Sequence, residues 1–263
     1  MRAFKKTSLH LLVLGCCLHP VAGAQAQAGM PDLEGICGAS SSYDLSLDGQ
    51  RLLFERAAPA PQRLELAPDG ALEVDGVAAR LNLEDRDRLA LISTRVHALV
   101  PEVRALARRA VDLAVEAVRE QAAATTGRGD AELDRVLEAR RRELHARIDA
   151  SRSTRDWQGD AFERDMQAIV AEIVPLVAAG LGERALAAAM SGDLAAAGRL
   201  RQDMVGLQGA LEARLGAKLA QLEPEARGLC PRLEEIDRLE SGLSVRPAGR
   251  PFDLVHIDRA AVR

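Results

Sequence analysis

The chain has 263 residues, a formal net charge of −4 and only 2% aromatic residues. This length suffices for one large domain or two small ones, and the scarcity of aromatics leaves Leu, Ala and Val to build a core of closely packed helices. The acidic balance argues against general binding of nucleic acid.

Residues 1–28 are predicted to be a secretion signal. Arg2, Lys5 and Lys6 form a charged start, and residues 9–18 form an apolar run that is too short to span a bilayer. Small residues at 24–28 offer cleavage sites. Removal of these three positive charges, with no acid among them, takes the net charge from −4 to −7. We therefore expect an exported, periplasmic protein without a transmembrane helix.

A lipoprotein signal is the alternative interpretation of the same segment. The sequence Val13-Leu14-Gly15-Cys16 lies at a suitable depth, and Cys16 would be the acylated residue. Leu14, two residues before the cysteine, matches such signals poorly, and the small-residue cleavage site follows downstream. Lipid anchoring at Cys16 is therefore the weaker expectation.

Residues 29–83 have the pattern of a small antiparallel β-meander of four or five strands. Short alternating runs are separated by Asp48-Gly49, by 68–70 (Pro-Asp-Gly) and by Asp75-Gly76, and a loop is expected at 57–61. Asp-Gly between alternating runs is the strongest short-range hairpin signal. A sheet of this size is not stable alone, so one face should lie on the helices.

Residues 84–243 predict a helical bundle organised around one long helix. Its apolar seam runs from Leu89 to Ala117 at alternating spacings of three and four, as in coiled coils. Asn82 is the expected N-cap, with Asp85 three residues later in a capping-box arrangement. Pro101 should kink this helix, and a new helix starting at Pro101 is the alternative.

Further helices are predicted over 130–150, over 161–181 with Pro175 inside, from Asp193 to about Leu222, and after Pro231. The third of these contains four glycines, each of which costs about 1 kcal/mol relative to Ala. Such a cost makes sense where another helix approaches closely, and this is expected at Gly198, Gly206, Gly209 and Gly216.

The last segment, 244–263, is predicted to be poorly ordered, although Phe252 to Ile257 has the pattern of a docked extended segment. The predicted fold class is therefore α+β, mainly α. A small N-terminal antiparallel β-meander would pack on a bundle of long, partly kinked helices.

Beyond the leader the cysteines are Cys37 and Cys230, and in an exported chain two cysteines favour a disulfide. By loop-closure entropy such a bridge would contribute about 5 kcal/mol as an upper figure. It would hold the N-terminal sheet region against the last helix. Two buried free thiols are the alternative.

Several segments resemble the YggN-like family, exported proteins of gammaproteobacteria without an assigned function. The shared features are a cysteine soon after a leader, Leu66 to Gly76 (Leu-x-Pro-Asp-Gly-x-Leu-x-Val-Asp-Gly), Leu81-Asn82, Leu99-Val100-Pro101 and a late Leu-Cys-Pro-Arg-Leu at 229–233. These features are structural rather than chemical. The resemblance implies a periplasmic location and supplies no catalytic residues.

No constellation typical of a cofactor, metal or catalytic site stands out. The histidines after the leader, His97, His145 and His256, are far apart and lack acids or cysteines at ligand spacing. No cofactor is therefore expected. An enzyme of unfamiliar type would need a deep pocket with convergent polar groups, for instance near Asp156, Asp160 and Glu163.

One basic cluster lies on the helix predicted at 130–150: Arg140, Arg141, Arg142 and Arg147. Interleaved acids favour a solvated, ion-paired face. The sharper alternative is a contact for anionic lipid or an acidic partner, which Arg108 and Arg109 would extend if the first two helices pair.

The sequence predicts an exported, non-catalytic protein of the cell envelope that presents helical surfaces for binding. A periplasmic enzyme of unrecognised type and a protein that binds lipid or a membrane surface are the alternatives. The expected partner is an envelope protein or anionic lipid, and the oligomeric state is left open.

Overall fold

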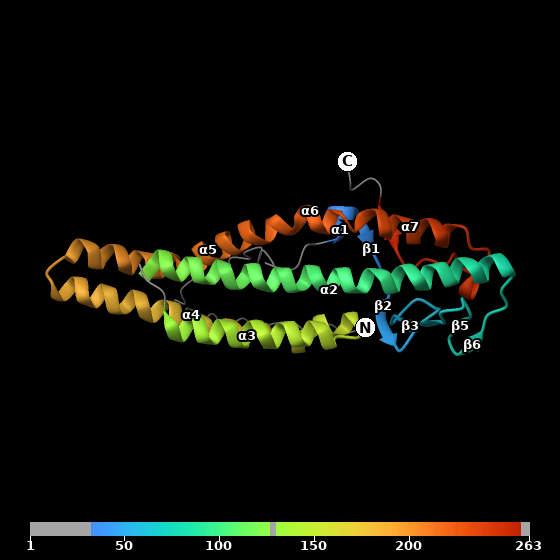
Figure 1. Cartoon of the computed structure of the whole chain (residues 1–263), viewed down its shortest axis with the longest axis horizontal. Coiled ribbons are helices and arrows are strands. Elements are labelled where there is room, and N and C mark those ends of the chain that lie inside the picture. Colours follow the sequence, from blue (N-terminus) through green and yellow to red (C-terminus); the bar gives the residue numbers. More distant parts are fainter. Residues whose placement is uncertain (1–32, 127–129, 259–263) are drawn as a thin grey trace, which may run out of the picture.

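The computed structural model describes residues 33–126 and 130–258. Figure 1 shows an elongated molecule in which one helix, α2 (Leu83–Thr126), runs along most of the length. In this view α3 lies along one side of α2, and α5, α6 and α7 follow one another along the other. The bounds of the remaining helices are α1 (Leu33–Cys37), α3 (Ala131–Ala150), α4 (Gly159–Met190), α5 (Leu194–Leu219), α6 (Glu223–Arg227) and α7 (Cys230–Ser241).

The predicted meander forms a five-stranded antiparallel sheet in the order β2-β3-β4-β5-β6, with every hydrogen-bonded neighbour consecutive in sequence. Its strands are β2 (Asp44–Asp48), β3 (Arg51–Glu55), β4 (Arg63–Leu66), β5 (Leu72–Val74) and β6 (Val77–Ala78). The turns fall at the predicted Asp-Gly positions, where Gly49, Gly70 and Gly76 have positive φ. The fold class is α+β, mainly α, as predicted.

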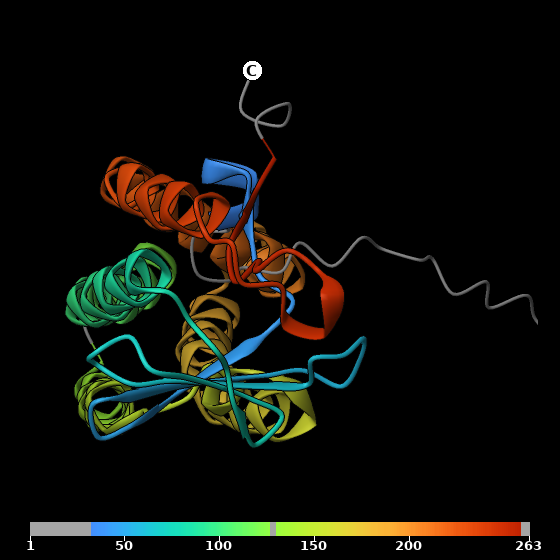
Figure 2. The same cartoon turned by 90° about the vertical axis from the view of Figure 1, so that its right-hand side faces the viewer.

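One face of the sheet lies on the helices. Figure 2 looks along the molecule from the end that carries this sheet. The core beneath it is built from the apolar face of three strands, the start of α2, the end of α7 and the chain after α7. Its buried members are Tyr43, Leu52, Phe54, Leu64, Leu66, Leu72, Leu89, Ile92, Val96, Ile236, Leu243, Phe252 and Leu254.

The edge of strand β2 is covered by the link between α3 and α4, which contains the 3₁₀-helix η1 (Thr154–Trp157). The backbone N–H of Leu47 donates to the carbonyl of Arg152 at 2.7 Å, and Arg155 pairs with Asp44 at 2.9 Å. An exposed strand edge would be free to pair with another chain, and this link blocks that edge.

The start of α2 is capped as predicted, because the Asn82 side-chain oxygen accepts the backbone N–H of Asp85 at 2.7 Å. The carboxylate of Asp85 instead accepts the backbone N–H and the hydroxyl of Ser244, at 2.8 and 2.6 Å. The reciprocal half of the predicted capping box is therefore replaced by a contact with a residue far along the chain.

The two internal prolines do not end their helices. Pro101 lies inside α2, so the alternative of a new helix beginning there is wrong. Pro175 lies inside α4, which continues to Met190 and is longer than the predicted helix over 161–181. Asp193 then caps α5, as predicted, by accepting the backbone N–H of Ala196 at 2.9 Å.

The glycines of α5 correct another expectation. A Cβ built at Gly198, Gly206, Gly209 or Gly216 meets no other described segment of the chain within 4 Å. The prediction that another helix of the chain approaches closely there is therefore wrong. The neighbouring helices α2 and α4 pack on a different face of α5.

The segment 244–258 is a second correction, because it is packed rather than poorly ordered. Phe252 and Leu254 are buried in the core beneath the sheet. The strand β7 (His256–Ile257) pairs antiparallel with β1 (Ala39–Ser40), as expected for a docked extended segment. The predicted signal peptide, 1–28, and Cys16 lie outside the described residues.

Candidate functional site

The helices α4 and α5 form a hairpin whose base is part of a second buried cluster. That cluster joins α2, α3, α4 and α5, and its buried members are Val115, Ala122, Leu133, Leu137, Ile173, Val177, Leu181 and Leu207. Leu181 and Leu207 are the members nearest the turn of the hairpin. Nearer the turn, Leu200 is partly buried and packs against the same core.

Residues 182–206, here called the arm, project beyond the C-terminal end of α2 in Figure 1. No residue of the arm is buried. Four of its large apolar side chains are instead mostly solvent-exposed: Leu186 by 63%, Met190 by 82%, Leu194 by 73% and Val205 by 76%. Because a helix normally turns its apolar residues toward a core, the arm is the most unusual surface in the described chain.

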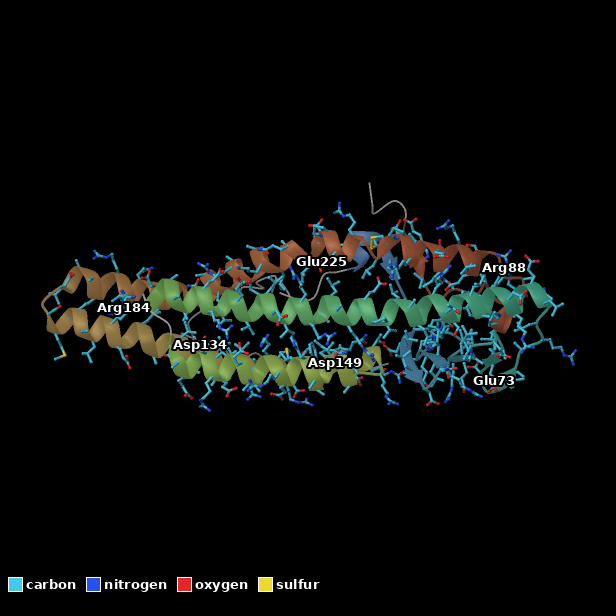
Figure 3. All side chains as sticks on the ribbon, viewed as in Figure 1. Glu73, Arg88, Asp134, Asp149, Arg184 and Glu225 are labelled. Carbon is cyan, nitrogen blue, oxygen red and sulfur yellow. A yellow bond between two sulfur atoms is a disulfide. The ribbon has the colours of Figure 1, made fainter. Side chains whose placement is uncertain are left out.

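The helix α4 is long and apolar enough to cross a membrane by length and composition, and only 11% of its most apolar stretch is buried inside the protein. It is the one helix among the described residues with this property. Figure 3 places Arg184 on the arm, where the helix again carries charge. The base of α4 is held in the protein core through Ile173, Val177 and Leu181.

The predicted basic cluster on α3 is largely neutralised by its neighbours. Arg140 donates to Glu172 at 2.6 Å and to Glu143 at 2.5 Å. The hydrogen bond to Glu172 raises the pKa of Arg140. Arg141 pairs with Glu138 at 2.8 Å. These contacts favour the interpretation of an ion-paired face, in which little positive charge is left for an anionic partner.

The other two arginines of this cluster differ from one another. Arg147 donates to Asp165 at 2.8 Å, and its guanidinium lies 5.3 Å from the centre of the Trp157 ring. Arg142 is exposed and has no ion pair within the described residues. Since α2 and α3 do pair, Arg108 reaches α3 as well, and it is neutralised by Asp149 at 3.2 Å.

The acids proposed for an enzymatic pocket do not converge. Asp156 organises the η1 turn, where its Oδ2 accepts the backbone N–H groups of Arg152 and Ser153 at 3.1 Å. Burial would raise the pKa of Asp156, but these bonds and the Ser151 hydroxyl outweigh it and lower the pKa. Asp160 and Glu163 are exposed on α4.

A small hollow lies elsewhere, between the sheet and the chain after α7, with a volume of about 220 Å³. Tyr43, Arg56, Arg250 and Phe252 are among its lining residues. Binding sites for small molecules usually enclose about 300–1,000 Å³. Within residues 33–126 and 130–258, no group of three or more His, Cys, Asp or Glu is arranged to hold a metal ion.

The Cys37–Cys230 disulfide is present and joins the end of α1 to the start of α7. Its Cα atoms are 5.3 Å apart across a separation of 193 residues. Cys37 packs with Ala39 and Leu233 in a small buried cluster beside the β1–β7 pair. The bridge thus holds the N-terminal region against the last helix, away from the arm.

The exposed apolar residues of the arm were not identified from the sequence. The available signal is the apolar, Ala-rich run over 185–190, beyond the regularly spaced residues of α4 that enter the core. A family model described as "Protein of unknown function (DUF2884)" matches residues 37–255. No curated protein and no solved structure matches the chain.

Proposed function

The chain belongs to the DUF2884 family, proteins of unknown function, and we propose that it is a non-catalytic, exported protein of the cell envelope that binds a partner through the arm. The observation that carries this proposal is the exposure of Leu186, Met190 and Leu194 near the turn of the α4–α5 hairpin. The predicted leader, the periplasmic location and the kinship with YggN-like proteins belong to the same proposal. The Cys37–Cys230 disulfide is compatible with an exported protein.

The physical argument concerns the cost of leaving the arm uncovered. Apolar side chains that stay in water contribute nothing to folding, and contiguous exposed apolar surface is typical of interaction sites. Burying one large aliphatic side chain at an interface is worth about 1.5–3 kcal/mol. Leu186 and Met190 lie one helical turn apart on α4, so one partner surface can cover both.

Several polar side chains of the candidate sites are already bonded to other residues of the chain, and this favours binding over catalysis. Arg140 and Arg141 of the α3 cluster form ion pairs, and Asp156 caps a turn. The hollow beside Tyr43 is smaller than the usual ligand pocket. A protein of this kind acts through the shape and chemistry of its helical surface.

The partner that fits the arm best is an apolar surface of another envelope protein. Anionic lipid is the second candidate, and the high hydropathy of α4 is the observation that favours it. In that version Arg142, which is free of ion pairs among the described residues, and Arg199 on the arm would contact headgroups.

The test is photo-crosslinking in living cells, with a crosslinking amino acid at Leu186 or Met190. Val77, at the sheet end, is the matched control because it is also apolar and 70% exposed. The proposal is supported if both arm positions give a defined crosslinked species and Val77 gives none. That species should also be lost when the other arm residue is changed to Ser. Equal labelling at all three sites would contradict it.

Lipid binding is tested separately, by co-sedimentation of the purified protein with vesicles of neutral or anionic phospholipid. Binding to anionic vesicles that falls on Arg142→Ala or Leu186→Ser supports the lipid version. An absence of binding across both compositions removes it and leaves the protein partner.

A further inference from the structure

The outward face of α5 has no partner among residues 33–126 and 130–258. Residues spaced by four and three along the helix share this face, and all of them are exposed. Such spacing is that of a helix that packs along a second helix. The positions are Gly198, Gln202, Val205, Gly209, Glu212 and Gly216.

Two features distinguish this face from an ordinary solvated one. Val205, at its centre, is 76% exposed, and Leu194, one turn before Gly198, is 73% exposed. Around them the surface is open, because a Cβ at Gly198, Gly209 or Gly216 would meet nothing within 4 Å. Since glycine weakens a helix, the close approach of a partner would explain why glycines occupy these positions.

We propose that the occupant is a second copy of this chain, bound through the outward face of α5 in an antiparallel, two-fold symmetric pair centred between Val205 and Gly209. When two such helices run antiparallel about that point, Val205 of one copy lies opposite Gly209 of the other. Gln202 then lies opposite Glu212, and Gly198 lies opposite Gly216. A two-fold interface requires this reciprocity, because each contact between copies must occur twice.

The charges on this face are complementary in the same register. Arg201 lies beside Gln202 and has no ion pair within the described chain. In the antiparallel pair it comes within reach of Glu212 of the second copy. Glu212 itself accepts a single intrahelical hydrogen bond, from Gln208 at 2.8 Å, and retains capacity for another. The pairing occurs twice, and no like charges are opposed.

The same residues argue against a lipid surface on this face. Gln202 and Glu212 lie in the middle of the stripe, where contact with hydrocarbon would leave a polar group and a charge unpaired. A second α5 offers both groups a partner and fits Val205 over a glycine. The two α5 helices would overlap along their whole length. In this register Gly192, at the turn of one hairpin, would lie opposite Leu222 of the other copy, just after the end of α5.

This inference goes beyond the proposed function, because a monomer could still bind its partner through Leu186 and Met190. Sedimentation equilibrium of the purified protein, expressed from its complete coding sequence, measures the dimer dissociation constant directly. Arg201→Glu and Glu212→Arg should each weaken the dimer by roughly tenfold, because each places like charges together twice. The combined variant restores opposite charges and should recover the original constant.

Val205→Lys supplies a second, stronger disruption, and it should leave a monomer with unchanged helical circular dichroism. Val174→Lys on α4, a partly exposed apolar residue outside the seam, is the matched control and should leave the dimer intact. A protein that is monomeric at all concentrations, or a dimer that resists Val205→Lys, would overturn the proposal. Failure of the charge swap to restore the dimer would overturn the antiparallel register.

Discussion

The carboxylate of Glu240, on α7, accepts a hydrogen bond from the backbone N–H of Leu254 at 2.8 Å. The same oxygen accepts the N–H of Val255 at 3.2 Å, while the other oxygen has no hydrogen-bond partner in the described chain. Glu240 is only 3% exposed. A buried acid therefore ties the last packed segment to α7, and its protonation is linked to folding.

Burial raises the pKa of Glu240 to about 8, above the ordinary value of 4.5, although the two N–H bonds lower it and the nearby Asp253 and Asp237 raise it slightly. Below about pH 4.5 the group is protonated in the folded and unfolded states and has no effect. Between pH 4.5 and 8 it ionises only when unfolded, so the free energy of unfolding falls as pH rises, by at most about 5 kcal/mol. Above pH 8 the free energy of unfolding falls no further on account of Glu240.

Glu240→Gln should remove this loss, because an amide does not ionise and its oxygen can still accept the N–H of Leu254. Urea unfolding at pH 5 and pH 9 should show a smaller difference for this variant than for the parent protein. Glu234→Gln, on the same helix but exposed, is the control and should keep the parent's difference. An equal difference in all three proteins would show that Glu240 is not responsible.

Reduction of the Cys37–Cys230 bridge should lower the free energy of unfolding by up to about 5 kcal/mol, because the bridge spans 193 residues and restricts the unfolded chain. Urea unfolding with and without dithiothreitol measures this loss. The double variant Cys37→Ser with Cys230→Ser should have the stability of the reduced protein and no response to dithiothreitol. A parent protein that is unaffected by reduction would contradict the prediction.

Gly70→Ala should destabilise the protein far more than Gly76→Ala. Both glycines have a similar positive φ, +79° and +81°, so the backbone strain is shared and costs about 1–2 kcal/mol in each variant. A Cβ at Gly70 would also lie 1.9 Å from the carbonyl oxygen of Arg86, which would push the sheet away from α2. Thermal unfolding of the two variants compares them, and equal midpoints would refute a close contact there.

Leu186→Ser should leave folding stability nearly unchanged, whereas Leu181→Ala should cost about 2–5 kcal/mol. The two residues are on the same helix, but Leu181 is fully buried and Leu186 is 63% exposed. Urea unfolding of both variants tests whether the arm's apolar residues serve the fold. A large loss from Leu186→Ser would mean that Leu186 supports folding and is not reserved for a partner.

Local sequence chemistry was enough to predict the sheet and most of the helix starts. Asp48-Gly49 and Asp75-Gly76 specify tight turns because glycine adopts positive φ without strain, and the hairpin register follows from the turn. Asn82 and Asp193 cap helices through contacts with residues three positions away. The turns and caps are formed by residues that are near one another in the sequence, so the sequence alone determines them.

Tertiary structure decided the contacts that join distant segments. Asp85 was predicted to cap its own helix, yet its carboxylate is taken by Ser244, 159 residues away, and the docked segment after it completes the core. Nothing in the local pattern specifies that partner, because a carboxylate binds any N–H that folding brings to it. Likewise, periodicity identified the apolar and glycine faces of the helices but not what covers them. Whether a face is buried depends on how far its neighbours extend, and α2 ends before the arm does.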